Sequence, residues 1–381
     1  MEEKLGLYIH IPFCVSKCNY CDFNSYPLEQ NKVEKYLAAL QLEMASYREI
    51  LEYNMKKIDT VYIGGGTPTC LAGKHLAYLF DYCLSLLPRK PGGEFSLEAN
   101  PGTLDRAKIK LLKKAGVNRI SMGLQAWQDR LLKGLGRIHD LDEFIDSYFL
   151  LKEEGFTNIN VDLMFGLPGQ TMDDWAESLT KLVELNPQHI SVYSLKLEEG
   201  TELFNLFQQG KVGLPSEDVE IEMYDYALDF LTEKGYKQYE ISNFSLPGYE
   251  CQHNLIYWEH QQYLGLGAGA HSYFNGYRYS NYNSINDYIF HLERGRLPIE
   301  TKEAINLQRR IEDTIILGLR LNKGIDLKEL AEETGEDLIL LYDEKLERLK
   351  KRGLIQFNGK NLSLTRKGLL LSNQVFLEFI C

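Results

Sequence analysis

The chain has 381 residues, 44% of them hydrophobic and 25% charged, with a formal net charge of -12 at pH 7. This length accommodates one large α/β domain of about 200–250 residues and a smaller one, and the composition is that of an ordinary soluble globular protein. The acidic balance argues against general nucleic-acid binding. No run approaches about 18 apolar residues and no signal-peptide pattern is visible, so we expect no transmembrane segment and a cytoplasmic protein.

Strand-like and helix-like runs alternate six times in the first half of the chain. The expected strands cover residues 5–11, 58–63, 94–99, 118–124, 158–165 and 189–195. This alternation indicates a parallel sheet with crossover helices, either closed towards a barrel or open and doubly wound. Candidate site residues follow the strand ends, which is where barrel sites lie. We therefore predict an α/β fold with a partial (β/α)6 TIM-like barrel over residues 1–240.

Three cysteines directly after the first expected strand are the most informative residues. Cys14, Cys18 and Cys21 have the spacing C-x3-C-x2-C. Three thiolates can hold a [4Fe–4S] cluster and leave one iron open for a small ligand. Structural zinc normally needs four ligands, and no second C-x2-C or H-x3-5-H pair follows. The total of seven cysteines shows no paired framework, so a disulfide is disfavoured and a reducing compartment fits.

A glycine-rich turn follows the second expected strand. The run Gly64-Gly65-Gly66-Thr67-Pro68-Thr69 lets the backbone approach a ligand closely. A phosphate loop is excluded because no Lys-Ser/Thr follows. The functional alternative is contact with the amino-acid end of a small ligand, and the structural alternative is a tight turn.

Two carboxylates lie inside otherwise apolar strands. Glu98 and Asp162 are costly to bury without partners. Each either pairs with an arginine or backbone donor, or binds a ligand amine or ribose hydroxyl. Arg119, Gln125 and Arg137 are the polar residues for which the same two alternatives apply.

Residues 241–298 differ from the rest in being rich in Tyr, Asn and Gly, and we expect an ordered but irregular connecting segment. It contains His253-Asn254-Leu255-Ile256-Tyr257-Trp258. An imidazole beside two aromatic rings suits a flat metal-containing ligand, with histidine as axial ligand. The structural alternative is a histidine hydrogen-bonded inside an aromatic minicore. His271 is a further candidate ligand.

Residues 299–381 have the pattern of a separate small domain. A short helix near residues 324–330 precedes a helix carrying Leu346 and Leu349. The Asn358-Gly359 pair then predicts a hairpin. This order predicts an α+β winged-helix-like domain, and its mixed charges argue against a role in DNA binding.

The sequence as a whole resembles the radical S-adenosylmethionine (SAM) superfamily, and more closely the oxygen-independent coproporphyrinogen III oxidase family. The runs that carry the resemblance are residues 7–14 (LYIHIPFC), 119–125 (RISMGLQ) and 162–169 (DLMFGLPG). The oxidase branch has a further cysteine two positions after the third, where this chain has Phe23. The HNxxYW run, residues 253–258, is similar to the signature of the other branch, the HemW-type haem chaperones.

The resemblance implies cofactors, partners and site residues. Its cofactors are a [4Fe–4S] cluster on the three cysteines, SAM and haem, with His253 as the implied haem ligand. Its SAM-contacting positions correspond to Tyr8, Tyr20, Gly65, Gly66, Thr67, Glu98, Gln125, Arg137 and Asp162. The implied function is haem binding and transfer to an unidentified acceptor protein; the alternative is radical-SAM decarboxylation of coproporphyrinogen III in porphyrin metabolism. Oligomeric state stays open, with a homodimer as one alternative.

Overall fold

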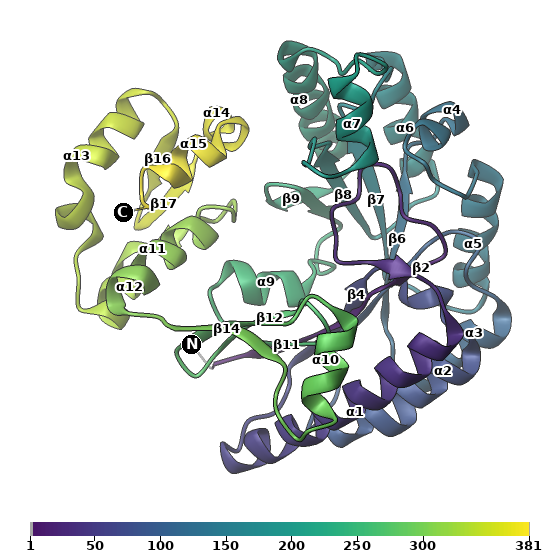
Figure 1. The fold of residues 1–381 in the computed structure, drawn as a ribbon. Helices are drawn as coiled ribbons and strands as arrows, with labels where there is room; N and C mark the ends of the chain where they lie inside the picture. The colour runs from purple at the N-terminus through teal and green to yellow at the C-terminus, as the bar shows by residue number, and fades with distance from the viewer. Residues whose placement is uncertain (1–2, 381) are drawn as a thin grey trace.

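The computed structural model describes residues 3–380 and is built around one curved sheet (Figure 1). Within these residues twelve strands pair in the order β14-β13-β12-β11-β1-β4-β5-β6-β7-β8-β10-β9. The strands that the alternating pattern predicts are its parallel centre: β1 (Leu5–Ile11), β4 (Thr60–Gly65), β5 (Phe95–Ala99), β6 (Arg119–Gln125), β7 (Ile159–Phe165) and β8 (His189–Ser194). In the described part of the chain β14 and β9 do not pair with each other, so the barrel is partial, as predicted.

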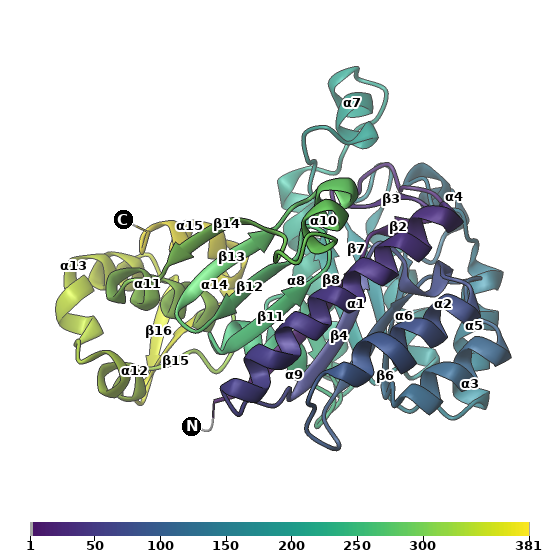
Figure 2. The same ribbon diagram turned by 60° about the horizontal axis from the view of Figure 1, so that its bottom comes forward.

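Crossover helices cover the convex face of this sheet (Figure 2). They are α1 (Gln30–Tyr53), α2 (Gly73–Tyr78), α3 (Arg106–Ala115), α5 (Leu141–Glu153), α6 (Met172–Glu184) and α8 (Glu217–Glu233). Their ends follow local chemistry. Asp140 and Glu143 form a capping box on α5, as Thr171 and Asp174 do on α6, and Gly116 ends α3 in the left-handed region. None of the helices within residues 3–380 is long and apolar enough to cross a membrane.

Two further helices lie near the C-terminal ends of the parallel strands. They are α4 (Asp129–Gly134) and α7 (Glu202–Gln208), and α7 projects beyond the rest of the barrel (Figure 2). A small apolar cluster joins them. Leu131 and Leu203 pack there with Met164, and Tyr20 of the cysteine loop packs against it. The two helices therefore support the loop in which the three cysteines lie.

The segment 241–298 is more regular than expected. It contributes β11 (Gln262–Leu266), parallel to β1, and the antiparallel strands β12 (His271–Phe274) and β13 (Tyr277–Asn281); β14 (Ile299–Ala304) continues them. At the other edge lie β9 (Lys237–Glu240) and β10 (Asn243–Ser245). The expectation of an irregular connector was wrong, because the segment adds strands to the main sheet and two of its tyrosines, Tyr279 and Tyr288, pack into the main core.

A buried carboxylate ties this segment to the first helix. Glu43 of α1 is fully buried and accepts hydrogen bonds from the Gly267 backbone (2.8 Å), the Asn281 amide (2.7 Å) and the Tyr288 hydroxyl (2.6 Å). A buried carboxylate needs such donors to offset its desolvation. Since β14 also belongs to the main sheet, the second structural unit begins after Ala304 rather than at residue 299.

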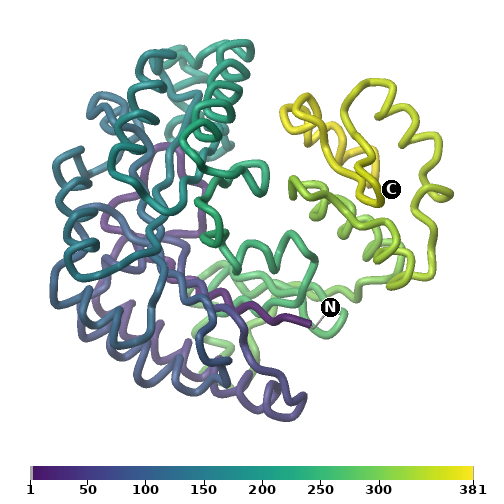
Figure 3. The backbone as a smooth tube through the Cα atoms, turned by 180° about the vertical axis from the view of Figure 1, so that it is seen from behind, coloured from purple at the N-terminus to yellow at the C-terminus, as the bar shows by residue number. Residues whose placement is uncertain are grey.

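The C-terminal unit has its own core and the predicted winged-helix order. Its elements are α11 (Leu307–Gly318), β15 (Ile325–Asp326), α12 (Leu327–Thr334), α13 (Leu338–Lys351), β16 (Ile355–Asn358), β17 (Asn361–Leu364), α14 (Arg366–Leu370) and α15 (Ser372–Leu377). It lies beside the barrel (Figure 3). Arg366 reaches α8 and pairs with Asp225 (2.7 Å) and Asp229 (2.6 Å).

Candidate cofactor-binding site

The C-terminal ends of the parallel strands enclose a cavity of about 490 Å³. Its lining includes most of the predicted site residues: Cys14, Cys18, Tyr20, Cys21, Gly65, Gly66, Thr67, Glu98, Gln125, Arg137 and Asp162. These residues come from five strand ends and the loops that follow them. The parallel topology therefore collects side chains that lie far apart in the sequence, as in barrel enzymes.

The cysteine loop is held from both sides. The Asn19 backbone N–H donates to the Leu135 carbonyl (2.9 Å) beyond α4, and the Asn19 carbonyl accepts from the Leu203 backbone N–H (2.8 Å) in α7. Such anchoring fixes the loop that presents Cys14, Cys18 and Cys21.

The three thiols are free and half-buried. Cys14 Sγ lies 3.7 Å from Thr67 Oγ1, and the Arg137 guanidinium donates to Cys18 Sγ at 3.6 Å. Burial raises the pKa of the Cys14 and Cys21 thiols, so binding a metal would release their protons. Within residues 3–380 no three His, Cys, Asp or Glu side chains, the three cysteines included, lie close enough together to hold a single metal ion.

The glycine turn is a place of close backbone approach. A Cβ on Gly64 would lie 2.7 Å from Glu98 Oε1, and one on Gly66 would lie 2.5 Å from the Phe13 carbonyl oxygen. Gly65 has φ +114°, a conformation that side-chain-bearing residues rarely adopt. Only glycine therefore lets this turn lie against both the carboxylate and the cysteine loop.

Glu98 is the carboxylate behind this turn. Its Oε1 accepts from the Tyr62 hydroxyl (2.9 Å) and its Oε2 from the Gly65 backbone N–H (3.0 Å). Burial raises the pKa of Glu98 to about 7 despite these two donors. A cationic ligand group would favour its ionised form, so Glu98 has the chemistry expected of a ligand for an amine.

Asp162 lies on the neighbouring wall of the cavity. It accepts from the Asn160 amide (2.8 Å) and more weakly from the Ser121 hydroxyl (3.4 Å), and burial raises its pKa. No arginine within residues 3–380 forms an ion pair with either carboxylate at 4.0 Å or less. The alternative of a direct ion pair with an arginine is therefore not realised for Glu98 or Asp162, whereas pairing with a backbone donor is realised for Glu98 through the Gly65 N–H.

Arg137 connects the cysteine loop with Asn100 and Gly123 on the opposite side of the cavity. Its Nη2 donates to Asn100 Oδ1 (2.9 Å) and to the Gly123 carbonyl (2.7 Å), while Asn100 Nδ2 donates to Thr67 Oγ1 (2.8 Å). Its Nε is buried and has no hydrogen-bond partner among the described residues. An orphaned guanidinium donor is costly unless a ligand completes it, so Arg137 is suited to an anionic group such as a carboxylate.

The comparisons with known proteins agree along the whole chain. Residues 8–182 match the model of the radical SAM superfamily, and residues 305–371 match the HemN C-terminal domain. The chain is 41% identical over 374 residues to the heme chaperone HemW of Bacillus subtilis, covering 98% of each protein. The chain belongs to the heme chaperone HemW family.

Other matches extend this relationship. The heme chaperone HemW of Lactococcus lactis is 37% identical over 383 residues, which cover 100% of this chain and 98% of that protein. The solved structure of coproporphyrinogen III oxidase (HemN) from Escherichia coli, described as a radical SAM enzyme, matches with a TM-score of 0.86 at 25% identity. That match covers 99% of this chain and 90% of HemN.

Two predicted residues of this HemW-family chain lie outside the cavity lining. Tyr8 is directly beneath it, with its ring stacked on Tyr62 at 6.3 Å between centroids. The Tyr8 hydroxyl hydrogen-bonds to His10 Nδ1 (2.9 Å), and His10 Nε2 bonds to the Asn24 carbonyl (2.8 Å). Tyr8 is placed to support the cavity from below rather than to contact a ligand in it.

His253 is the other, and the structure gives its haem-ligand interpretation no support. The side chain is buried, and both ring nitrogens have partners: Nδ1 bonds to Thr60 Oγ1 and Nε2 to the Tyr257 hydroxyl, each at 2.8 Å. Burial lowers its pKa to about 3, so the ring is neutral. The structure favours the alternative of a histidine satisfied inside an aromatic cluster, and His271 lies exposed on β12.

Sequence reasoning missed several residues of the cavity lining. Tyr62, Asn100, Ser121, Gly123 and Tyr193 also line the cavity. Tyr62, Ser121 and Gly123 lie on β4 and β6, which also carry predicted residues, and Asn100 directly follows β5. Tyr193 lies on β8, which carries no predicted residue. Their strand positions were therefore the available signal, although nothing in their residue types distinguished them from core or loop residues.

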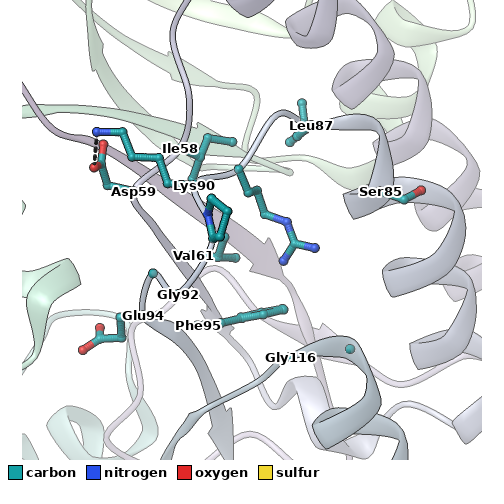
Figure 4. Close-up of a pocket in the computed structure, with 14 residues that line it drawn as sticks. Ile58, Asp59, Val61, Ser85, Leu87, Lys90, Gly92, Glu94, Phe95 and Gly116 are labelled. Carbon is teal, nitrogen blue, oxygen red and sulfur yellow. Dashed lines mark ion pairs between the residues drawn. The ribbon is translucent and has the colours of Figure 1, made fainter.

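A second cavity, of about 430 Å³, lies at the opposite, N-terminal ends of β4 and β5 (Figure 4). Ile58, Val61 and Phe95 line it together with Asp59 and Lys90, which form an ion pair at 2.8 Å. None of the predicted cofactor residues faces it. Every predicted site residue of this HemW-family chain that lines one of these two cavities lines the first.

Gly123 allows a test of the side of the cavity that Gln125, Arg137 and Asn100 form. A Cβ there would lie 2.9 Å from Gln125 Nε2 and 3.3 Å from both Arg137 Nη2 and Asn100 Oδ1. We expect Gly123→Ala to displace these groups and weaken SAM binding about tenfold, at the lower end of the cost of overpacking. Equilibrium binding of SAM to the reconstituted protein measures this. Gly134→Ala is the matched control, because no atom lies within 4 Å of its added Cβ; equal affinity in both variants would contradict the assignment.

Proposed function

We propose that this protein is a haem chaperone that holds a [4Fe–4S] cluster and SAM in the barrel cavity, binds haem and passes it to an acceptor protein. The near full-length relationship to proteins named heme chaperone HemW carries this proposal. The alternative is coproporphyrinogen III decarboxylation, which the HemN match keeps open. Phe23 favours the chaperone, because the oxidase branch has a cysteine at this position.

The residues around the cavity fit the two cofactors. Cys14, Cys18 and Cys21 would hold three irons, and the fourth would accept the amine and carboxylate of SAM. The turn at Gly65 and Gly66 would contact the methionine end. Gln125, Arg137 and Tyr20 would contribute donors, and Thr67, Glu98 and Asp162 acceptors. A cluster on half-exposed thiols also favours a reducing compartment such as the cytoplasm.

The rim of the same cavity offers a surface for haem, which is a flat apolar ring with two carboxylates. Phe23 is 64% exposed and Tyr193 is 39% exposed, and both line the opening. Lys17, which donates to the Phe23 carbonyl (3.0 Å), and Lys196 line it too. Aromatic walls with two cations beside them suit the ring and its propionates.

A haem titration tests this function. We expect about one haem per chain in the wild-type protein and at least tenfold weaker binding in Phe23→Ala/Tyr193→Ala, since two exposed ring contacts are lost. Absorbance in the Soret region, followed under anaerobic conditions, measures both. Tyr53→Ala is the control, because this tyrosine is 88% exposed at the far end of α1. Wild-type protein that binds no haem would contradict the chaperone function.

A further inference from the structure

The HNxxYW motif forms helix α9 (Gln252–Trp258), which lies on the concave face of the sheet, opposite α1 (Figure 1). It packs beneath the cofactor cavity. A Cβ on Gly6 of β1 would come within 3.3 Å of the His253 ring, and Thr60 of β4 bonds to that ring. The motif therefore closes the floor of the barrel and reaches the site from below without facing solvent.

One contact route leads from α9 to Glu98. The His253 ring is fixed between Thr60 and the Tyr257 hydroxyl, and it stacks on Tyr62 with 5.3 Å between centroids and 28° between planes. The Tyr62 hydroxyl donates to Glu98 Oε1 at 2.9 Å. The orientation of the Glu98 carboxylate thus depends on a ring that His253 holds in place.

A second route leads from the start of the same helix to Asp162. The Cys251 backbone N–H donates to the Tyr239 hydroxyl (3.2 Å), which bonds to His189 Nε2 (2.9 Å). His189 Nδ1 bonds to Asn160 Oδ1 (2.6 Å), and the Asn160 amide donates to Asp162 (2.8 Å). With the neutral His189 ring carrying its proton on Nδ1, each group in this series donates towards the carboxylate, so the series has one consistent direction.

The helix itself is anchored at both ends. Glu94 accepts from the backbone N–H groups of Gln252 (2.9 Å) and His253 (3.1 Å). At the other end, the Arg320 guanidinium of the C-terminal unit lies 4.3 Å over the Trp258 ring. These contacts hold α9 in one position relative to the sheet.

We propose that His253 and Tyr257 are positioning residues for SAM, acting through Tyr62 on Glu98, and that His253 is not a haem ligand. This inference rests on the proposed assignment of SAM to the cavity. The inference gives the HNxxYW motif a structural role in SAM binding. The buried position of His253 and the hydrogen bonds to both of its ring nitrogens support this role. A neutral ring with no free lone pair supplies geometry rather than coordination.

The test compares His253→Ala, His253→Gln, Tyr62→Phe and the His253→Ala/Tyr62→Phe double variant in reconstituted protein. We expect about tenfold weaker SAM binding in His253→Ala and in Tyr62→Phe, because each disturbs one hydrogen bond to a buried carboxylate. The double variant should lose no more than either single variant, since both act through the same bond. Glutamine can bond to both Thr60 and Tyr257 and should restore most of the affinity. The Soret band of bound haem should stay unchanged throughout.

His260→Ala is the matched control. His260 also bonds to a threonine, Thr314 (2.7 Å), and stacks on a tyrosine, Tyr273 (4.7 Å between centroids), but it is remote from the cavity lining. Its SAM affinity should equal that of the wild type. Should His253→Ala fail to fold, Tyr62→Phe and His253→Gln still decide the matter, because the inference requires a loss in the first and near wild-type affinity in the second.

Four outcomes would overturn the inference. A shifted or lost Soret band in His253→Ala with unchanged SAM affinity would make His253 a haem ligand. Additive losses of SAM affinity in the double variant would show that His253 and Tyr62 act independently of each other. Wild-type protein that binds no SAM would remove the proposed cofactor assignment and this inference together, whereas wild-type binding with unaffected variants would remove the inference alone.

Discussion

Simultaneous replacement of Cys14, Cys18 and Cys21 by alanine is expected to lower the iron content of the reconstituted protein from about four per chain to near zero. The three thiols are the only protein ligands that the proposed cluster has, so no part of it should persist. Iron and sulfide analysis, together with the broad visible absorption of the cluster, measures the loss.

Replacement of Cys70 provides the control for this experiment. It also tests whether the fourth iron of the cluster lacks a cysteine ligand. Cys70 follows the glycine turn, and its thiol donates to the Phe13 carbonyl (3.5 Å), which places it next to the cysteine loop. Because three ligands suffice, Cys70→Ala should keep its four irons. Loss of the cluster in Cys70→Ala would show a fourth cysteine ligand and would leave no iron open for SAM. A triple variant that retains the cluster would contradict the ligand assignment itself.

Glu98→Gln is expected to weaken SAM binding by about 1–3 kcal/mol, which is the cost of losing a buried charged hydrogen bond. Addition of SAM should perturb the EPR spectrum of the reduced cluster by ligating the open iron, and titration of that change gives the affinity. An unchanged wild-type spectrum would exclude SAM at the iron.

The pH dependence of the same titration separates the effect of the Glu98 charge on SAM affinity from the effect of the side chain's shape. Burial raises the pKa of Glu98 to about 7, so in the free protein this carboxyl is largely protonated below pH 7 and ionised above it. Only the ionised form attracts a cationic amine, so wild-type affinity should rise between about pH 6 and 7.5. Glu98→Gln cannot titrate and should lack this rise. The same slope in both proteins would place the titrating group elsewhere.

The parallel core was predictable because its strands are buried on both faces and read as apolar runs. Leu7, Ile9 and Ile11 are fully buried in β1, and the helices between strands carry strong caps. The cysteines and the glycine turn were predictable as site residues for a different reason. Folding alone rarely requires three cysteines with the spacing C-x3-C-x2-C or three consecutive glycines after a strand. Because parallel strands end at the same edge of a sheet, the predicted strand order was enough to place these residues around one cavity.

The concave floor was not predictable in the same way. Tyr62 has no sequence pattern that distinguishes a site tyrosine from a core tyrosine, and its role follows only from the register that places it beside Glu98. The strands β11 to β13 were missed because Tyr, Asn and Gly are frequent in loops, whereas here Tyr279 and Tyr288 fill the core. The chemistry of His253 suggested a haem ligand, but only the structure supplies the two partners that occupy its nitrogens.

The choice between a haem chaperone and an oxidase is tested most directly by one sample assayed for both. Protein reconstituted anaerobically, with its cluster, SAM and a reductant present, is titrated with haem and then incubated with coproporphyrinogen III. The account predicts about one bound haem per chain and no decarboxylated product, because Phe23 stands where the oxidase branch has its additional cysteine. Sustained turnover of coproporphyrinogen III would contradict the account and identify the chain as an oxidase.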